Sequence, residues 1–200
     1  RDQVRWPNAR AVAGLAEMIH SEWAVFATVA LAHALAVASP GPDFAMIVRQ
    51  SLAFGRGAGL WTAAGIGSGI LFHVAYGLFG LNWLTQRYPQ SLTVLGVAGA
   101  LFLLWMGSQA VRAKPLPEVS EVLPAAQPGD PAKFFGIGVL TNVLNPKAVL
   151  FFVALFTAVV TGPVSTALKV TLGVWIPLAT FGWFAFVATM LGNEATRRKL

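Results

Sequence analysis

The sequence "VASPGPDFAMIVRQ", residues 37–50, breaks a long apolar segment with two prolines, a glycine and an aspartate. Pro40 has no backbone N–H and disfavours helical geometry at the residue before it, so a first half-helix is expected to end there. Gly41 would then cap a second half-helix, with Pro42 at its first position and Asp43 at its second. A carboxylate is stabilised at that position by the free N–H groups and the helix dipole.

A second stretch, "TNVLNPKAVLFF" at residues 141–152, has the same order of residue types. Asn145 is a good N-cap, Pro146 takes the first helical position and Lys147 the second. Each break falls within a segment that begins a group of three apolar segments. Paired interruptions at corresponding places in two halves indicate an inverted-repeat transporter whose site lies between the halves.

The composition indicates a membrane protein. The 200 residues are 56% hydrophobic and 11% charged, with a mean hydropathy of +0.66, whereas soluble domains are nearer a quarter charged. The apolar residues come in runs of about 20, the length of a helix that crosses a bilayer. The predicted fold is an all-α polytopic bundle of two inverted three-helix repeats, with spans at residues 23–53 (broken at 40–43), 60–81, 92–111, 134–160 (broken at 145–146) and 168–191.

Both ends of the chain depart from a simple six-span pattern. Residues 1–17 are polar, and Met18 directly precedes the first apolar run, so residues 1–17 are predicted to be a non-native extension and residues 18–200 the transmembrane domain. A cleaved secretory signal is the alternative. The chain ends in a basic flank after an odd number of spans, which predicts that a sixth span is missing. Residues 112–133, rich in proline and acidic residues, are expected to form a flexible loop.

The net charge of +6 and the pI near 10.3 are explained by topology, and no nucleic-acid partner is expected. The basic residues lie at the ends of apolar runs, as the positive-inside rule requires. With the native N-terminus outside, the loop 112–133 is cytoplasmic and the outer side receives Arg87 and Lys169. The inner side then receives Arg49, Arg56, Arg112, Lys114, Lys133, Arg197, Arg198 and Lys199. The chain has no cysteine, which excludes disulfides and thiolate metal sites.

The two breaks are expected to face each other if the first span runs inward and the fourth outward. Asp43 and Lys147 then become candidate partners near the middle of the bilayer, where an unpaired charge costs ~3 kcal/mol or more. The breaks would form a polar socket for a zwitterion or an ion. The alternative is architectural: prolines kink many membrane helices, and an Asp–Lys pair can simply join two helices.

Smaller signals lie in the first two spans. Gly65, Gly67 and Gly69 form a glycine run that predicts close helix packing. His33 and His73 are candidates for a proton path, with interhelical hydrogen bonding as the alternative. Neither histidine has the neighbours of a metal site, and no metal is expected.

Three segments resemble the LysE/RhtB family of bacterial amino-acid exporters: "SPGPDF" (39–44), "GRGAGLWTAAGIGSG" (55–69) and "GIGVLTNVLNPKAVLFF" (136–152). That family carries a Pro-Gly-Pro motif in its first span, a glycine-rich second span and an Asn-Pro-Lys-like motif in its fourth. The resemblance covers residues 18–191, and Asp-Phe after the Pro-Gly-Pro is most similar to the threonine/homoserine exporters.

The resemblance implies an inner-membrane secondary transporter, not an enzyme, that exports small amino acids or their derivatives by proton antiport without a cofactor. A homo-oligomer is left open. Lys147 would take the substrate carboxylate, and Asp43 the amino group or the coupling proton. The rival functions are efflux of another solute or a metal cation, and a non-transporting scaffold or regulatory subunit. The positions that match the family motifs are Gly41, Pro42, Asp43, Asn142, Asn145, Pro146 and Lys147.

Overall fold

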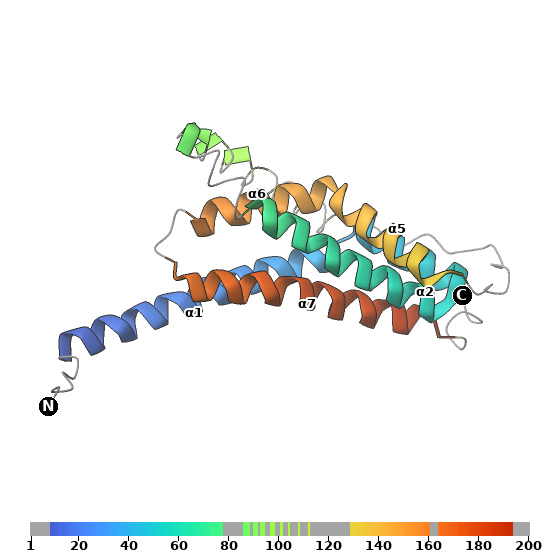
Figure 1. The fold of residues 1–200 in the computed structure, drawn as a ribbon, viewed down its shortest axis with the longest axis horizontal. Helices are drawn as coiled ribbons and strands as arrows, with labels where there is room; N and C mark the ends of the chain where they lie inside the picture. Colours follow the sequence, from blue (N-terminus) through green and yellow to red (C-terminus); the bar gives the residue numbers. More distant parts are fainter. Residues whose placement is uncertain are drawn as a thin grey trace, which may run out of the picture.

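A computed structural model of the chain describes residues 9–77, 129–160 and 164–193, with scattered positions from 86 to 112. Its long helices are α1 (Ala9–Ala38), α2 (Pro42–Ala75), α5 (Pro131–Val143), α6 (Pro146–Val160) and α7 (Thr166–Leu191), and no strand occurs in the described residues (Figure 1). The predicted all-α bundle is confirmed. The predicted third span, 92–111, and the loop 112–133 lie mostly outside the described residues.

Helix α2 reverses direction at Gly55. This residue has φ 83° and ψ −179°, in the left-handed region that glycine adopts without a steric penalty. Ile47 and Ile66 share one buried cluster, although a straight helix would separate them by about 28 Å. Residues 42–54 and 56–75 therefore form an antiparallel hairpin, visible at the right of Figure 1. The turn falls between the predicted end of the first span, at residue 53, and the predicted start of the second span, at residue 60.

Both predicted breaks are confirmed. Helix α1 ends at Ala38, and α2 begins at Pro42 with Gly41 as its N-cap. Helix α5 ends at Val143 and α6 begins at Pro146, and the two are bent by 56°. Proline at the first position and a missing N–H at each junction explain why one helix stops and another starts.

The first helix is longer than predicted. It starts at Ala9, upstream of residue 23, so the polar residues that precede the apolar run continue the same helix. Apolar segments long enough to cross a bilayer are Ser21–Ala38, Pro42–Ala75 and Thr166–Leu191, together with the bent pair Pro131–Val143 and Pro146–Thr157. Of these, Pro42–Ala75 consists of the two arms of the hairpin.

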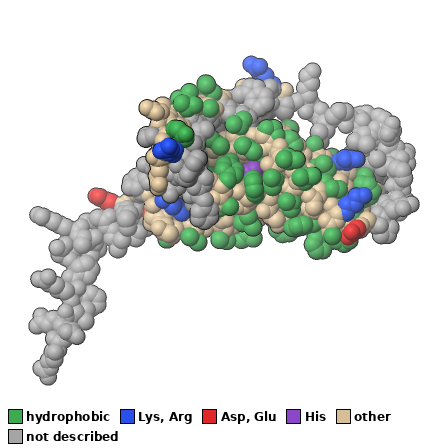
Figure 2. All heavy atoms as spheres, turned by 45° about the horizontal axis from the view of Figure 1, so that its top comes forward, with side chains coloured by type: hydrophobic (Ala, Val, Ile, Leu, Met, Phe, Trp, Pro, Cys, Tyr) green, Lys and Arg blue, Asp and Glu red, His purple; other side chains and the backbone are tan. Residues whose placement is uncertain are grey.

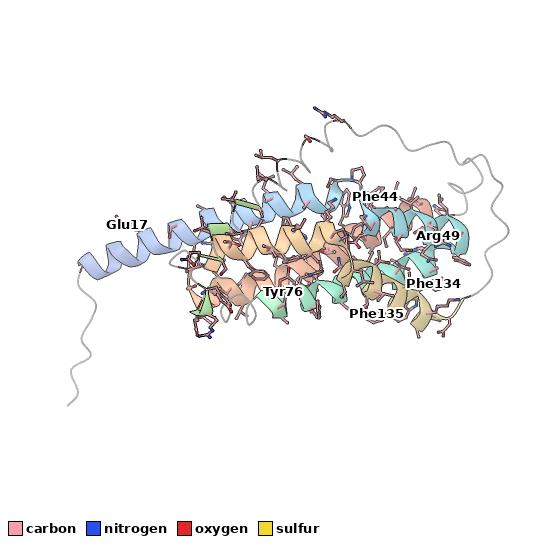
Figure 3. The ribbon with its side chains drawn as sticks, turned by 90° about the horizontal axis from the view of Figure 1, so that it is seen from above. Glu17, Phe44, Arg49, Tyr76, Phe134 and Phe135 are labelled. Atoms are coloured by element: carbon pink, nitrogen blue, oxygen red, sulfur yellow. The ribbon has the colours of Figure 1, made fainter. Side chains whose placement is uncertain are left out.

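The outer surface suits a bilayer. Leu31, Leu104 and Leu178 are each more than 60% exposed, and apolar side chains cover the central part of the face in Figure 2. Arg49 and Phe134 lie at one end of the bundle, and Glu17 lies at the other (Figure 3). The basic residue next to Phe134, Lys133, is therefore near the same end as Arg49, as the predicted topology requires.

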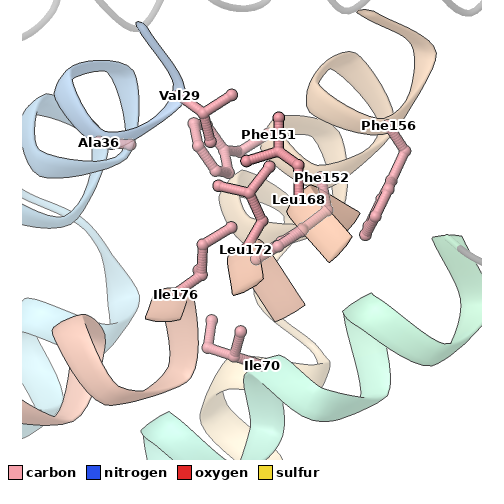
Figure 4. Packing of buried hydrophobic residues seen from close by; sticks show 9 residues of the cluster. All are labelled: Val29, Ala36, Ile70, Phe151, Phe152, Phe156, Leu168, Leu172 and Ile176. Carbon is pink, nitrogen blue, oxygen red and sulfur yellow. The ribbon is translucent and has the colours of Figure 1, made fainter. Parts of the chain in front are cut away.

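Two clusters hold the bundle together. In one, buried residues of α1, α2, α6 and α7 meet around Phe152 and Ile176 (Figure 4). In the other, Ile47 and Ile66 of the α2 hairpin pack against Phe184 of α7. Both clusters lie beside the two breaks and fix the position of the residues there.

The predicted close packing of the glycine run is confirmed. A Cβ on Gly65 would lie 2.1 Å from the carbonyl oxygen of Phe135, and a Cβ on Gly138 would lie 2.2 Å from the carbonyl oxygen of Thr62. Gly67 faces α7, where a Cβ on Gly67 would lie 3.1 Å from the Cβ of Phe181. Helix α2 therefore contacts α5 backbone to backbone, which only glycine permits.

Candidate functional site

A cavity of about 50 Å³ lies where the two breaks meet. It exceeds the ~10–15 Å³ that one water needs. Apolar side chains from α1, α2, α6 and α7 form part of its wall, among them Phe44, Phe151 and Phe184. The polar side chains that line it are His33, Ser39, Asp43, Asn142, Asn145, Lys147 and Thr180.

Lys147 reaches from the start of α6 to the end of α1. Its ammonium donates to the carbonyl oxygen of Ser39 at 2.7 Å, to the Ser39 hydroxyl at 2.6 Å and to the carbonyl oxygen of Pro40 at 3.3 Å. The side chain passes over Gly41, where a Cβ would lie 3.0 Å from Lys147 Cδ. The predicted approach of the two breaks is therefore observed, with Lys147 joining them.

Asp43 faces the opposite helix end. Its Oδ2 accepts a hydrogen bond from Asn142 Nδ2 at 2.9 Å, and the side chain of Asn145 lies beside the same carboxyl group. Oδ1 is buried and has no hydrogen-bond partner among the residues that the structure describes. A negative charge with an unpaired oxygen at a cavity wall is suited to a cationic group or a proton.

The direct Asp43–Lys147 pair considered from the sequence is not formed. No hydrogen bond or ion pair joins the two side chains in the described part of the chain. Asp43 instead bonds Asn142 near the end of α5, and Lys147 bonds Ser39 at the end of α1. The physical reason is local: three oxygens at the end of α1 already satisfy the ammonium. Both side chains are partly buried and line the cavity.

Asn142 connects Asp43 to His73. It is fully buried, and its backbone carbonyl accepts from His73 Nε2 at 3.1 Å. Because a carbonyl can only accept, the hydrogen bond assigns a proton to Nε2. Gly69 gives the Asn142 side chain room, since a Cβ there would lie 2.8 Å from Asn142 Oδ1. His73 and Asp43 thus bond two different groups of Asn142, its backbone carbonyl and its side-chain amide.

The two predicted histidines both bond across helices. His33 of α1 lies 2.9 Å from the Thr180 hydroxyl of α7, and His73 is stacked on Phe152 with ring centroids 5.2 Å apart. His33 lines the cavity, whereas His73 reaches it through Asn142. Interhelical hydrogen bonding thus describes both residues, and a proton path through them stays a prediction.

The remaining predicted positions shape the helix ends. Asn145 caps α6 by accepting from the Lys147 backbone N–H at 3.0 Å, and Pro42 and Pro146 open α2 and α6. Ser39 and Thr180 were not among the predicted site residues. Ser39 precedes the first proline of the break, at the end of the first half-helix, and this position was a usable signal. Thr180 lies within the apolar helix α7, three residues after Pro177, and no sequence pattern links it to His33.

The chain belongs to the family of LysE type translocators, whose model matches residues 34–200. It is 31% identical over 175 residues to the threonine efflux protein of Escherichia coli (strain K12), which covers 87% of this chain and 85% of that protein. It is 29% identical over 118 residues to the homoserine/homoserine lactone efflux protein of Salmonella typhimurium, and this match covers 59% of this chain and 56% of that protein. No solved structure matches the chain significantly. The predicted family is confirmed, and the protein is a multi-pass membrane translocator.

Proposed function

We propose that this protein is a secondary transporter that exports small amino acids across the bacterial inner membrane by proton antiport. The observation that carries the proposal is the cavity between the two broken helices, which presents the Lys147 ammonium and the Asp43 carboxylate without joining them. A free amino acid carries both charges and would contact both groups. Relatives named as threonine, homoserine and leucine efflux proteins support this substrate class.

Each half of the site has a role in the proposed mechanism. The substrate carboxylate would bind the Lys147 ammonium at the N-terminus of α6, where the helix dipole favours an anion. Asp43 Oδ1, which has no hydrogen-bond partner among the described residues, would take the substrate amino group or the coupling proton. Transport would follow as the cavity opens alternately to the two sides of the membrane.

Hydrogen bonds of the site join the two halves that the proposed mechanism would move against each other. Residues 21–75 would form one half and residues 131–191 the other. Side-chain hydrogen bonds of the site that cross between them include Lys147 to Ser39, Asn142 to Asp43, His73 to Asn142 and His33 to Thr180. These hydrogen bonds would be exchanged if one half moved against the other, and the two apolar clusters that span the same halves would have to shift with them.

Counterflow in proteoliposomes tests the proposed function. Vesicles loaded with unlabelled amino acid are expected to accumulate the labelled amino acid transiently, and an outward flux is expected to increase when a proton gradient is imposed. A panel of threonine, homoserine, leucine and lysine would identify the substrate. The absence of flux for every amino acid, from a protein that is folded in the vesicles, would favour a scaffold or regulatory subunit instead.

Topology gives a second prediction. We expect the loop at residues 112–133 to be cytoplasmic and the loop at residues 82–91 to be external, because basic residues flank the first. Since the chain contains no cysteine, single cysteines in each loop can be labelled with a membrane-impermeant maleimide in intact cells. Labelling of the 112–133 loop from outside would contradict the proposed orientation.

A further inference from the structure

We propose that the end of α1 is a binding subsite for a primary ammonium group, and that Lys147 occupies it in this conformation in place of the substrate's amino group. The subsite consists of the Ser39 carbonyl, the Ser39 hydroxyl and the Pro40 carbonyl. The inference rests on the proposed function. It adds a second contact for the substrate's amino group, at the end of α1, to the contact with Asp43.

The sequence of the break creates the free oxygens. A helix carbonyl normally accepts from the N–H four residues later. Pro40 has no N–H, so the carbonyl of Ala36 loses its usual donor. Helix α1 ends at Ala38, which leaves the carbonyls of Ser39 and Pro40 outside the regular hydrogen bonds of the helix. The last regular bond of α1 runs from Ser39 N to the carbonyl of Leu35 at 3.1 Å. Beyond it, the C-terminal carbonyls must find other donors, and the negative end of the helix dipole favours a cation there.

The Ser39 hydroxyl is oriented as an acceptor. It donates its single proton to the carbonyl of Ala36, at 2.9 Å, which replaces the donor that Pro40 lacks. Its lone pairs are then directed to the Lys147 ammonium at 2.6 Å. Three oxygen acceptors thus surround one ammonium, and the three N–H groups of a primary ammonium can each find one.

The surroundings also select a small cationic group. Ser39 is buried and lines the cavity, and the Asp43 carboxylate lines the same cavity. At Gly41 a Cβ would lie 3.2 Å from Lys147 Nζ, so a side chain there would crowd the subsite. An amino group that replaced Lys147 would meet the same oxygens and the same nearby carboxylate.

A zwitterion can exchange with Lys147, but a simple amine cannot. The carboxylate of an amino acid would attract the Lys147 ammonium away from α1, and the amino group of the same molecule would take the vacated oxygens. An amine without a carboxylate offers Lys147 no new partner. It must therefore compete for the oxygens of α1 with the Lys147 ammonium, which is covalently held nearby. The wild-type protein should therefore reject small amines, although its cavity contains an ammonium site.

Removing the tethered ammonium tests the subsite. In Lys147→Met the side chain is one atom shorter and uncharged, so the oxygens at the end of α1 are vacant. The probe is 1-amino-2-propanol, which is threonine without its carboxylate, and binding is measured by calorimetry and thermal stabilisation in detergent. We expect affinity for this amine to be roughly tenfold or more higher in Lys147→Met than in wild type, the magnitude of one charge-assisted hydrogen bond.

Two controls separate the subsite from a general effect of the vacated space. The trimethylammonium analogue of the probe has the same charge but no N–H and should not bind Lys147→Met. Adding Ser39→Ala should weaken binding of the amine roughly tenfold, since one of three acceptors is removed. Equal binding of the amine and its trimethyl analogue, or amine binding by wild type as strong as by Lys147→Met, would overturn the inference.

A measurement on the wild-type protein does not depend on how well the variants fold. Trimethylation of the amino group of a transported amino acid should weaken its competition in counterflow by roughly tenfold or more. Undiminished competition would also overturn the subsite. Wild-type flux of the unmodified amino acid is scored separately, so a failure of the proposed function is distinguishable from a failure of the ammonium subsite.

Discussion

In the Asp43→Asn variant, export driven by a proton gradient is expected to fall to the level of liposomes without protein, while counterflow persists. An amide keeps the size and most of the hydrogen-bonding capacity of the carboxylate, but it cannot bind and release the coupling proton. Substrate exchange without a gradient requires no net proton transfer and should remain measurable. The two assays on the same vesicles separate coupling from binding.

The structure also predicts that Asp43→Asn folds. Asn142 Nδ2 donates to one oxygen of Asp43, and an amide oxygen can accept the same bond. Lys147 is not left unpaired, because its ammonium is bonded to Ser39 and Pro40. The matched control is Asp130→Asn, the same chemical change at the exposed N-cap of α5, where asparagine also caps well. Gradient-driven export at the wild-type rate in Asp43→Asn would rule out proton coupling through this carboxyl group.

The Gly138→Ala variant is expected to be strongly destabilised. Its Cβ would lie 2.2 Å from the carbonyl oxygen of Thr62 and 2.9 Å from the Ile66 nitrogen, both backbone atoms that no rotamer change can move away. The α2–α5 contact must then separate, at a cost of ~1–3 kcal/mol or more for an overpacked interior. Thermal unfolding in detergent, followed by intrinsic fluorescence and size-exclusion profile, would measure the loss.

Gly136→Ala provides a control on the same helix. A Cβ at Gly136 has no atom within 4 Å, and alanine has the higher helix propensity. This variant should be as stable as wild type or slightly more stable. If Gly136→Ala and Gly138→Ala lowered the unfolding temperature equally, the effect would come from helix propensity or insertion, and the close α2–α5 contact would not be its cause.

The two breaks could be predicted from the sequence because their causes are local. A missing N–H at Pro40 or Pro146 acts on the adjacent residues in any tertiary context. The turn at Gly55 was placed only approximately, since several glycines lie near it and the packing of Ile47 against the second arm selects one. The partners of Lys147 and Asp43 could not be predicted, because a long flexible side chain chooses among oxygens that distant segments bring together.

The histidines show the same limit. His73 and Asn142 are 69 residues apart, and His33 and Thr180 are 147 apart. Hydropathy and spacing indicate that such residues need polar partners within a membrane, but not which ones. The glycine run was more informative because glycines four residues apart, here Gly65 and Gly69, share one helix face and indicate a close neighbour. Gly138 of α5 lies on the surface that meets this face.

The hairpin turn at Gly55 has an electrical consequence. Arg56 is exposed at the turn and would mark the membrane surface there. Asp43 lies twelve helical residues away, about 18 Å along the helix axis, in a hydrocarbon core of ~30 Å. A proton that reaches Asp43 from the side on which the turn lies would then cross roughly half of the membrane field. Since a full crossing corresponds to ~2.3 kcal/mol per 100 mV, the occupancy of this carboxylate would respond to voltage before any substrate moves.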